Sequence, residues 1–295
     1  MYHEYHERRA HRLAATIWDS SGRPTPPGHP PDTTRTTADR HPDRTGPSDR
    51  TERTERTERT GVVGSRRVLP DGCMDIIWSS DANLIVAGPD TAAKLVRWAP
   101  GVRHVGLRFD SGSGPSHLGV AADELRDQRV PLADLWGDGP AQRLAERLAM
   151  AADPLVAFES SIAARPVHPA LVDRLVPAVL AGARARAPVD DLARTVGLSE
   201  RQLLRRCRRV FGYGPKTLAR ILRMQDALHA ARAGIPFAVV AAEAGYADQA
   251  HLAREVRALA GVPPTHLIRN VNVQDELDVS VSDVADVAAA TGSGA

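Results

Sequence analysis

Apolar residues recur at helical spacing along the last third of the chain, and a glycine interrupts the pattern at two points. One apolar stripe precedes Gly197 and another precedes Gly245. Glycine readily adopts the left-handed backbone conformation that ends a helix and turns the chain. The pattern therefore predicts two copies of one unit, a short helix, a tight turn and a second helix, over residues 189–210 and 237–260.

The second helix of each unit has a recognisable start and a polar outer face. The run Ser199-Glu200-Arg201-Gln202 has the Ser-x-x-Gln form of a capping box, and Asp248 is the expected N-cap of the other helix. Residues three or four apart share one face of a helix. The outward positions are Arg201, Leu204, Arg205 and Arg208 on the first helix, and Gln249, His251 and Arg254 on the second.

These outward side chains suit contact with DNA. A helix held at a fixed angle by a tight turn is a common device for entering a major groove. Arginine and glutamine can form paired hydrogen bonds with guanine and adenine edges. We therefore expect Gln249, His251 and Arg254 to be candidates for reading bases, and a merely solvated face is the alternative for any single arginine.

One amphipathic helix is predicted between the two units. Pro215 suits a first helical position, and apolar residues follow it at helical spacing through residues 215–232. At about 1.5 Å per residue such a helix is roughly 27 Å long. Successive major-groove faces on one side of B-DNA recur about every 34–36 Å. With the breadth of the two units added, one chain is long enough to reach two adjacent grooves.

The order and spacing of four segments point to a family. They are the run 189–199, the segment 211–215, the run 241–252 and the closing Gly261-Val262-Pro263-Pro264. Together they resemble the C-terminal domain of the AraC/XylS family of bacterial transcription regulators, over residues 189–267. The resemblance implies a sequence-specific regulator and not an enzyme. It also implies that the second helix of each unit contacts bases, at Arg201, Leu204, Arg205 and Arg208 in the first unit and at Gln249, His251 and Arg254 in the second.

The resemblance also implies partners and local departures. Double-stranded promoter or operator DNA is the expected partner, and RNA polymerase, a small-molecule effector and a second copy of the chain are further candidates. Cys207 and Leu252 stand where the family usually has phenylalanine, and Arg206 stands where an aliphatic residue is common. Looser packing behind the two recognition helices is expected.

Charge is concentrated in the same region. The whole chain has 38 basic and 36 acidic residues, a net charge of +2. Between residues 184 and 232 there are 12 lysines and arginines against 4 acidic residues, a net charge of +8. A local excess of this size favours binding to phosphates.

The middle of the chain changes from a strand pattern to a helix pattern. Short β-branched or aromatic runs occupy residues 75–78, 84–87, 95–98 and 104–109, and the last run alternates apolar with other residues. After residue 116 the pattern predicts helices at 118–127, 140–152, 154–164 and 169–183. We expect an α+β protein with a small β-rich domain of barrel or sandwich type, trailing helices, and an all-α domain containing both units.

Composition suggests the boundaries between these parts. Residues 19–61 contain a Thr-Glu-Arg repeat and almost no apolar side chains, so they are expected to be a disordered insertion after a first strand within residues 1–18. Residues 62–182 would form the N-terminal domain and residues 183–269 the DNA-binding domain. Residues 270–295 carry acidic but no basic residues and are expected to be a disordered tail.

The sequence of the N-terminal domain allows two roles. In the resembled family this domain commonly senses a small molecule or mediates dimerisation, and a module without an effector is the alternative. Asp71, Cys73 and Asp75 alternate and are candidate effector-binding residues, although Pro-Asp-Gly more often marks a simple turn.

Other classes of function find little support in the sequence. No phosphate-binding loop, nucleophile elbow or zinc motif occurs, so no cofactor or metal is expected. A methyl-accepting DNA-repair protein would need about four cysteines around zinc, and the chain has two in all. The sequence shows no signal peptide and no membrane-spanning run, so we expect a cytoplasmic, nucleoid-associated protein.

Overall fold

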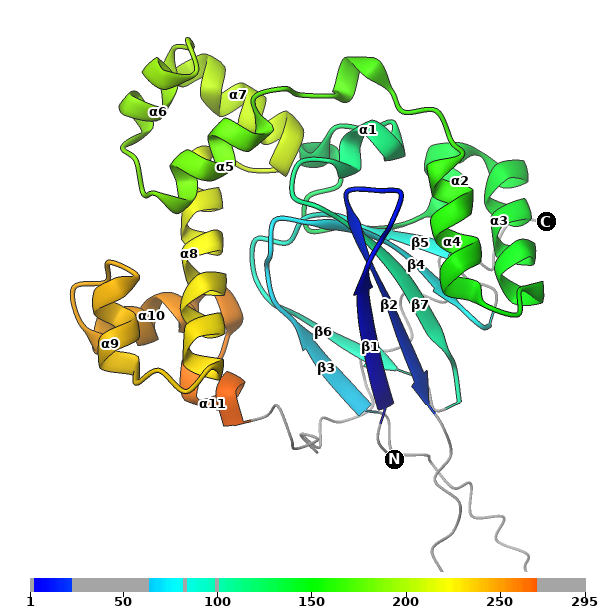
Figure 1. Ribbon diagram of the computed structural model, residues 1–295, viewed down its shortest axis with the longest axis horizontal. Coiled ribbons are helices and arrows are strands. Elements are labelled where there is room, and N and C mark those ends of the chain that lie inside the picture. Colours follow the sequence, from blue (N-terminus) through cyan, green and yellow to red (C-terminus); the bar gives the residue numbers. More distant parts are fainter. Residues whose placement is uncertain (1–2, 23–63, 82–83, 99–100, 270–295) are drawn as a thin grey trace, which may run out of the picture.

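The computed structural model describes residues 3–22, 64–81, 84–98 and 101–269 (Figure 1). A β-rich N-terminal part lies beside a C-terminal group of helices, so the expected α+β class is confirmed. The expected acidic tail and most of the expected insertion lie outside the described residues.

The N-terminal part is built on antiparallel strands. Among the described residues, a six-stranded sheet has the order β1-β2-β7-β4-β5-β8, and β3 pairs with β6 in a second, two-stranded sheet. The strands are β1 (His3–Arg9), β2 (Ala15–Gly22), β3 (Gly64–Val68), β4 (Met74–Ser79), β5 (Leu84–Ala87), β6 (Lys94–Trp98), β7 (His104–Phe109) and β8 (Arg129–Pro131). All four strands expected from β-branched runs are therefore present.

The N-terminal segment departs from the expectation of a single strand. It forms a hairpin, and its second strand, β2, runs inside the sheet next to β7 and continues to Gly22. The first residues of the expected insertion thus belong to the sheet. Asp19 is 7% exposed and pairs with Arg103 at 2.6 Å, which compensates for burying its charge.

Close packing fixes how β2 lies on its neighbour. Trp18 faces Gly106 of β7 in the strand register, and a Cβ added at Gly106 would lie 2.1 Å from the Trp18 ring. Only glycine fits there. Ile17, Ile76 and Leu107 are fully buried in the core beneath the sheet.

Helices follow the strands, with two corrections to the expected ranges. Residues 118–127 are not one helix, because Gly119 ends α1 (Gly114–Leu118) with a φ of +81° and only the short 3-10 turn η1 (Ala122–Glu124) follows. Residues 169–183 are likewise split. The remaining elements of this part are α2 (Leu132–Trp136), α3 (Asp138–Met150), α4 (Pro154–Ala163) and the 3-10 turn η2 (Pro169–Leu171). The next helix, α5 (Val176–Arg184), packs against α8, and its Val179 and Ala183 are buried in the C-terminal core.

The C-terminal helices pack around one long helix, α8 (Pro215–Arg232), which runs between two helix pairs (Figure 1). One pair is α6 (Val189–Thr195) and α7 (Glu200–Phe211), and the other is α9 (Phe237–Glu243) and α10 (Gln249–Ala260). A short last helix, α11 (Pro264–Arg269), packs against α8. No helix in the described ranges is long and apolar enough to cross a membrane.

Candidate nucleic-acid interface

The first helix pair has the geometry that the sequence predicts. Gly197 takes a φ of +70° between α6 and α7. The Ser199 hydroxyl accepts a hydrogen bond from the Gln202 amide nitrogen at 3.3 Å, and the Gln202 side chain accepts one from the Ser199 amide nitrogen at 2.8 Å. This reciprocal capping box starts α7 at Glu200 and fixes the rotation of the helix about its axis.

The outer face of α7 is cationic and accessible. Leu203, Cys207, Val210 and Phe211 are buried on its inner side. The four positions expected to read bases, Arg201, Leu204, Arg205 and Arg208, are all exposed on the opposite side. The structure therefore brings this predicted set together on one surface.

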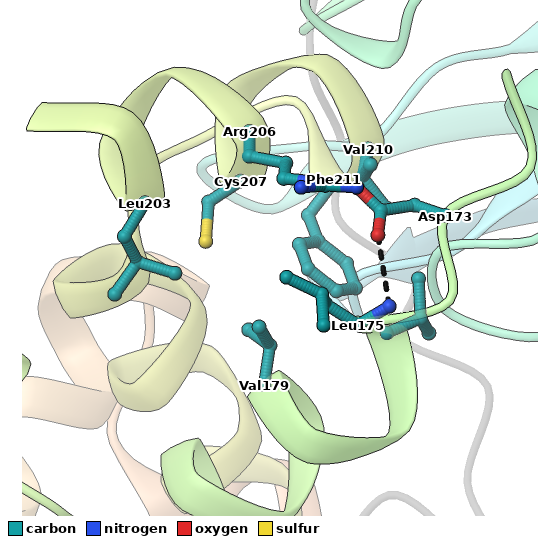
Figure 2. Close-up of a pocket in the computed structure, with 9 residues that line it drawn as sticks. Asp173, Leu175, Val179, Leu203, Arg206, Cys207, Val210 and Phe211 are labelled. Atoms are coloured by element: carbon teal, nitrogen blue, oxygen red, sulfur yellow. Dashed lines mark hydrogen bonds and ion pairs between the residues drawn. The ribbon is translucent and has the colours of Figure 1, made fainter. Parts of the chain in front are cut away.

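A small cavity lies behind α7, where the sequence suggested loose packing (Figure 2). It measures about 10 Å³, and Cys207 and Val179 are among its apolar lining. This is about the least space that can hold one water molecule, so the smaller cysteine side chain leaves only a minor void. Burial raises the pKa of the Cys207 thiol to about 12, which keeps it protonated and unreactive at neutral pH.

The second helix pair has the same arrangement as the first, except that one predicted base-reading residue is half-buried. Gly245 also takes a φ of +70°, and the Asp248 carboxylate caps α10 by accepting a hydrogen bond from the His251 amide nitrogen at 2.6 Å. Gln249 and Arg254 are exposed, whereas His251 is half-buried. The predicted residues again share one helix, but His251 is more enclosed than its neighbours.

Comparing the two helices residue by residue reveals a position that sequence reasoning missed. Both α7 and α10 have 12 residues, and each ends at a glycine in the left-handed conformation. Arg205 and Arg254 are therefore equivalent, as are Arg208 and Arg257. Arg257 is exposed and joins the candidate face of α10. The repeat itself carries this signal, because aligning the two N-caps, Ser199 and Asp248, places the arginines opposite each other.

Charged contacts hold α10 against the long helix α8. Glu255 of α10 accepts a hydrogen bond from Arg220 at 2.9 Å and lies 3.7 Å from Arg223. The hydrogen bond from Arg220 is the main cause of a lowered pKa for the Glu255 carboxyl group. Arg223 also lies over the ring of Tyr246, 4.2 Å from its centre. These contacts hold α10 in a fixed orientation against α8.

The N-terminal part contacts the flank of α7 next to its exposed face. Arg206 forms an ion pair with Asp173, whose side chain is only 10% exposed (Figure 2). Arg209 donates a hydrogen bond to the Ala170 carbonyl oxygen at 3.1 Å. The base-reading face stays accessible, but one side of the helix is committed to contacts within the protein.

An open cleft of about 660 Å³ lies beside the same flank. Arg205 and Arg209 line it from α7, and Asp123 and Glu124 line it from η1. A duplex that approached α7 at Arg205 would therefore meet negative charge from the N-terminal part.

The residues expected to bind an effector gather around an arginine. Asp75 pairs with Arg108 at 3.1 Å, and Asp71 lies 3.3 Å from the same guanidinium. Burial raises the pKa of the Asp75 carboxyl group, and Arg108 opposes that shift. The Cys73 amide nitrogen donates to the Asp71 side chain at 2.9 Å, and burial raises the pKa of the Cys73 thiol. Asp71, Cys73 and Asp75 are therefore close together, and both carboxylates already pair with Arg108.

Comparisons with known families and proteins agree with the C-terminal geometry. The family described as a helix-turn-helix domain matches residues 192–270. A second family, a domain of unknown function (DUF6597), matches residues 53–131. The comparison with curated proteins gives no significant match.

Solved structures with similarity to the chain include bacterial regulators. A probable AraC family transcriptional regulator from Rhodopseudomonas palustris is 23% identical, with 33% of this chain and 96% of that chain covered and a TM-score of 0.29. The C-terminal domain of AraT from Geobacillus stearothermophilus is 20% identical, covering 37% and 97%, with a TM-score of 0.30. Fatty-acid-bound ToxT from Vibrio cholerae is 9% identical, covering 73% and 97%, with a TM-score of 0.41.

Proposed function

We propose that this chain is a DNA-binding transcriptional regulator of the AraC/XylS type, and that α7 and α10 read two adjacent major-groove segments of one operator. The match of residues 192–270 to the helix-turn-helix family supports this proposal. Arg201, Leu204, Arg205 and Arg208 would make the contacts of α7. Gln249, His251 and Arg254 would make those of α10, together with Arg257.

One observation carries the proposal more than any other. Two helices of equal length, each N-capped and each ended by a left-handed glycine, present exposed arginines at equivalent positions. The 18-residue helix α8 lies between them and is roughly 27 Å long. A matched pair of basic helices on a rigid spacer suits neighbouring grooves of one duplex.

We further propose that the N-terminal part modulates this binding. Its contacts with Arg206 and Arg209 lie on the flank of α7, so a ligand or a second copy of the chain that shifts them would change access to the DNA. This proposal has three further parts. The effector would bind around Asp71, Cys73 and Asp75, the protein would contact RNA polymerase, and it would act in the cytoplasm.

Selection of bound fragments from genomic DNA tests the central claim. The wild-type chain should enrich a site with two conserved blocks about one helical turn apart. Arg205→Ala should relax one position in one block, and Arg254→Ala should relax one position in the other, each by about 1–3 kcal/mol of discrimination.

A matched variant separates base reading from general loss of charge. Arg143 is exposed on α3, far in sequence from either unit, so Arg143→Ala removes the same charge without touching the proposed interface. It should leave the selected sequence unchanged. A selected site that is identical in all four proteins would contradict the proposed reading residues.

A further inference from the structure

The turn before α10 is one residue longer than the turn before α7. Residues 196–199 connect the first pair of helices, and residues 244–248 connect the second. The longer turn places an additional amide at Ala247, which donates a hydrogen bond to Nδ1 of His251 at 3.2 Å. His251 therefore ties the turn to the third residue of its helix, as Gln202 does in the first unit.

This hydrogen bond determines where the imidazole carries its proton. A nitrogen that accepts from a backbone amide has no hydrogen of its own, so in the neutral ring the proton is on Nε2. The ring is also held in place. Tyr246 packs edge-on against it, with ring centres 5.3 Å apart, and Arg223 in turn lies over Tyr246.

His251 lies in the part of α10 that a recognition helix commonly presents to DNA. His251 lies between Gln249 and Arg254 in the sequence, in the first turn of α10, and the N-terminal residues of a recognition helix are those that contact base edges. His251 is half-buried, and because Nδ1 accepts from the Ala247 amide in the turn, Nε2 lies on the side of the ring away from that amide.

We propose that His251 is a specificity-determining residue that presents Nε2–H as a fixed hydrogen-bond donor to an acceptor on a base edge. Purine N7, guanine O6 and thymine O4 are such acceptors in the major groove, whereas cytosine presents an amino donor there. His251 would therefore select against cytosine at one position of the operator. This inference rests on the proposed function, because it requires α10 to enter the groove.

Two substitutions separate the turn contact from the DNA contact. His251→Asn keeps a side-chain oxygen near the place of Nδ1 but removes the Nε2 donor. His251→Phe keeps a ring against Tyr246 but removes both groups. In His251→Asn we expect only a small fall in melting temperature, from the lost ring contact with Tyr246, and about a fivefold loss of discrimination against cytosine at one position, the effect of one hydrogen bond. In His251→Phe we expect the same loss of discrimination and a lower melting temperature.

Sequence selection with the full-length chain gives the decisive readout. An unchanged preference in His251→Asn would overturn the inference, since a purely structural histidine predicts that result. A uniform loss of affinity across all sequences would indicate a phosphate contact and would also overturn it. If Arg254→Ala relaxes a neighbouring position while His251→Asn does not, only the His251 inference fails. If the wild-type chain selects no sequence, the proposed function itself fails.

The tautomer of the neutral His251 ring can be measured without DNA. Nitrogen-15 NMR of the full-length chain should show the Nε2–H tautomer for His251 at neutral pH, assigned by comparison with His251→Asn. The Nδ1–H tautomer would contradict the hydrogen bond from Ala247 and with it the fixed donor.

Discussion

At the scale of single residues, Glu159 shows how one buried carboxylate organises the N-terminal hairpin. It is 5% exposed and accepts hydrogen bonds from the Arg12 amide nitrogen at 2.8 Å and from Arg8 at 3.0 Å, as well as from the His11 amide nitrogen. Burial alone would raise its pKa, but these donors outweigh burial and lower it. The carboxylate thus joins the turn between β1 and β2 to α4.

Glu159→Gln should lower the free energy of unfolding at neutral pH by about 1–3 kcal/mol, because the amide cannot accept from all three donors. The folded pKa lies below the unfolded value of about 4.3, so the stabilisation is complete above that value and is lost as the pH falls through the folded pKa. Urea unfolding at pH 7 and pH 3 should show a difference between the two proteins that shrinks at pH 3.

The exposed Glu124 provides the control for this measurement. Glu124→Gln makes the same chemical change on the surface, and its effect should stay within about 0.5 kcal/mol at both pH values. A loss of equal size at pH 3 and pH 7 in Glu159→Gln would show that the ionised form is not what stabilises the hairpin.

At the scale of elements, Glu255 links recognition helix α10 to the linker helix α8. Glu255→Gln should weaken this link and loosen the base preferences read by α10, while those read by α7 stay the same. Its side chain is 22% exposed, so the loss of unfolding free energy should be below about 1 kcal/mol.

Sequence selection measures the block of the operator read by α7 separately from the block read by α10. Glu243→Gln on the exposed side of α9 is the matched control, and equal relaxation of both blocks would contradict a local role.

The elements that could be predicted are those whose causes are local. The recognition helices follow from a cap, an apolar stripe and a terminal glycine, all within about a dozen residues. The expected helix over residues 118–127 fails because Gly119 ends α1 by a left-handed turn, which periodicity alone does not reveal. The hairpin and the continuation of the sheet past residue 18 could not be foreseen, because the pairing of β2 with β7 and the ion pair of Asp19 with Arg103 join residues more than 80 positions apart. The role of Asp173 was equally hidden, since its partner Arg206 lies 33 residues away.

At the scale of the whole molecule, the N-terminal part contacts both helix pairs. Arg126 donates to the Gly212 carbonyl oxygen at the end of α7, at 3.3 Å. The Ala93 amide nitrogen donates to the Leu259 carbonyl oxygen near the end of α10, at 2.8 Å, and Arg67 donates to Ala260 at 3.0 Å. The β-rich part therefore bridges the two units on the side of α8 that it faces (Figure 1).

This arrangement places the acidic wall of the cleft where DNA would approach α7. Asp123 and Glu124 share the cleft with Arg205, and at physiological salt a charge acts over about 8 Å. Neutralising both, as Asp123→Asn with Glu124→Gln, should tighten binding to the selected operator by about three- to tenfold at low salt, since each exposed charge contributes up to about 1 kcal/mol.

A second pair of acidic residues tests whether the tighter binding comes from the position of the removed charges or from the change in total charge. Asp138→Asn with Glu146→Gln changes the net charge by the same amount, on exposed positions of α3. Fluorescence anisotropy with labelled operator should show a larger gain for the cleft pair, and the gain should shrink as salt is added, because added ions screen exposed charges. Equal gains for both pairs would mean that only the total charge matters and that the cleft does not oppose the duplex.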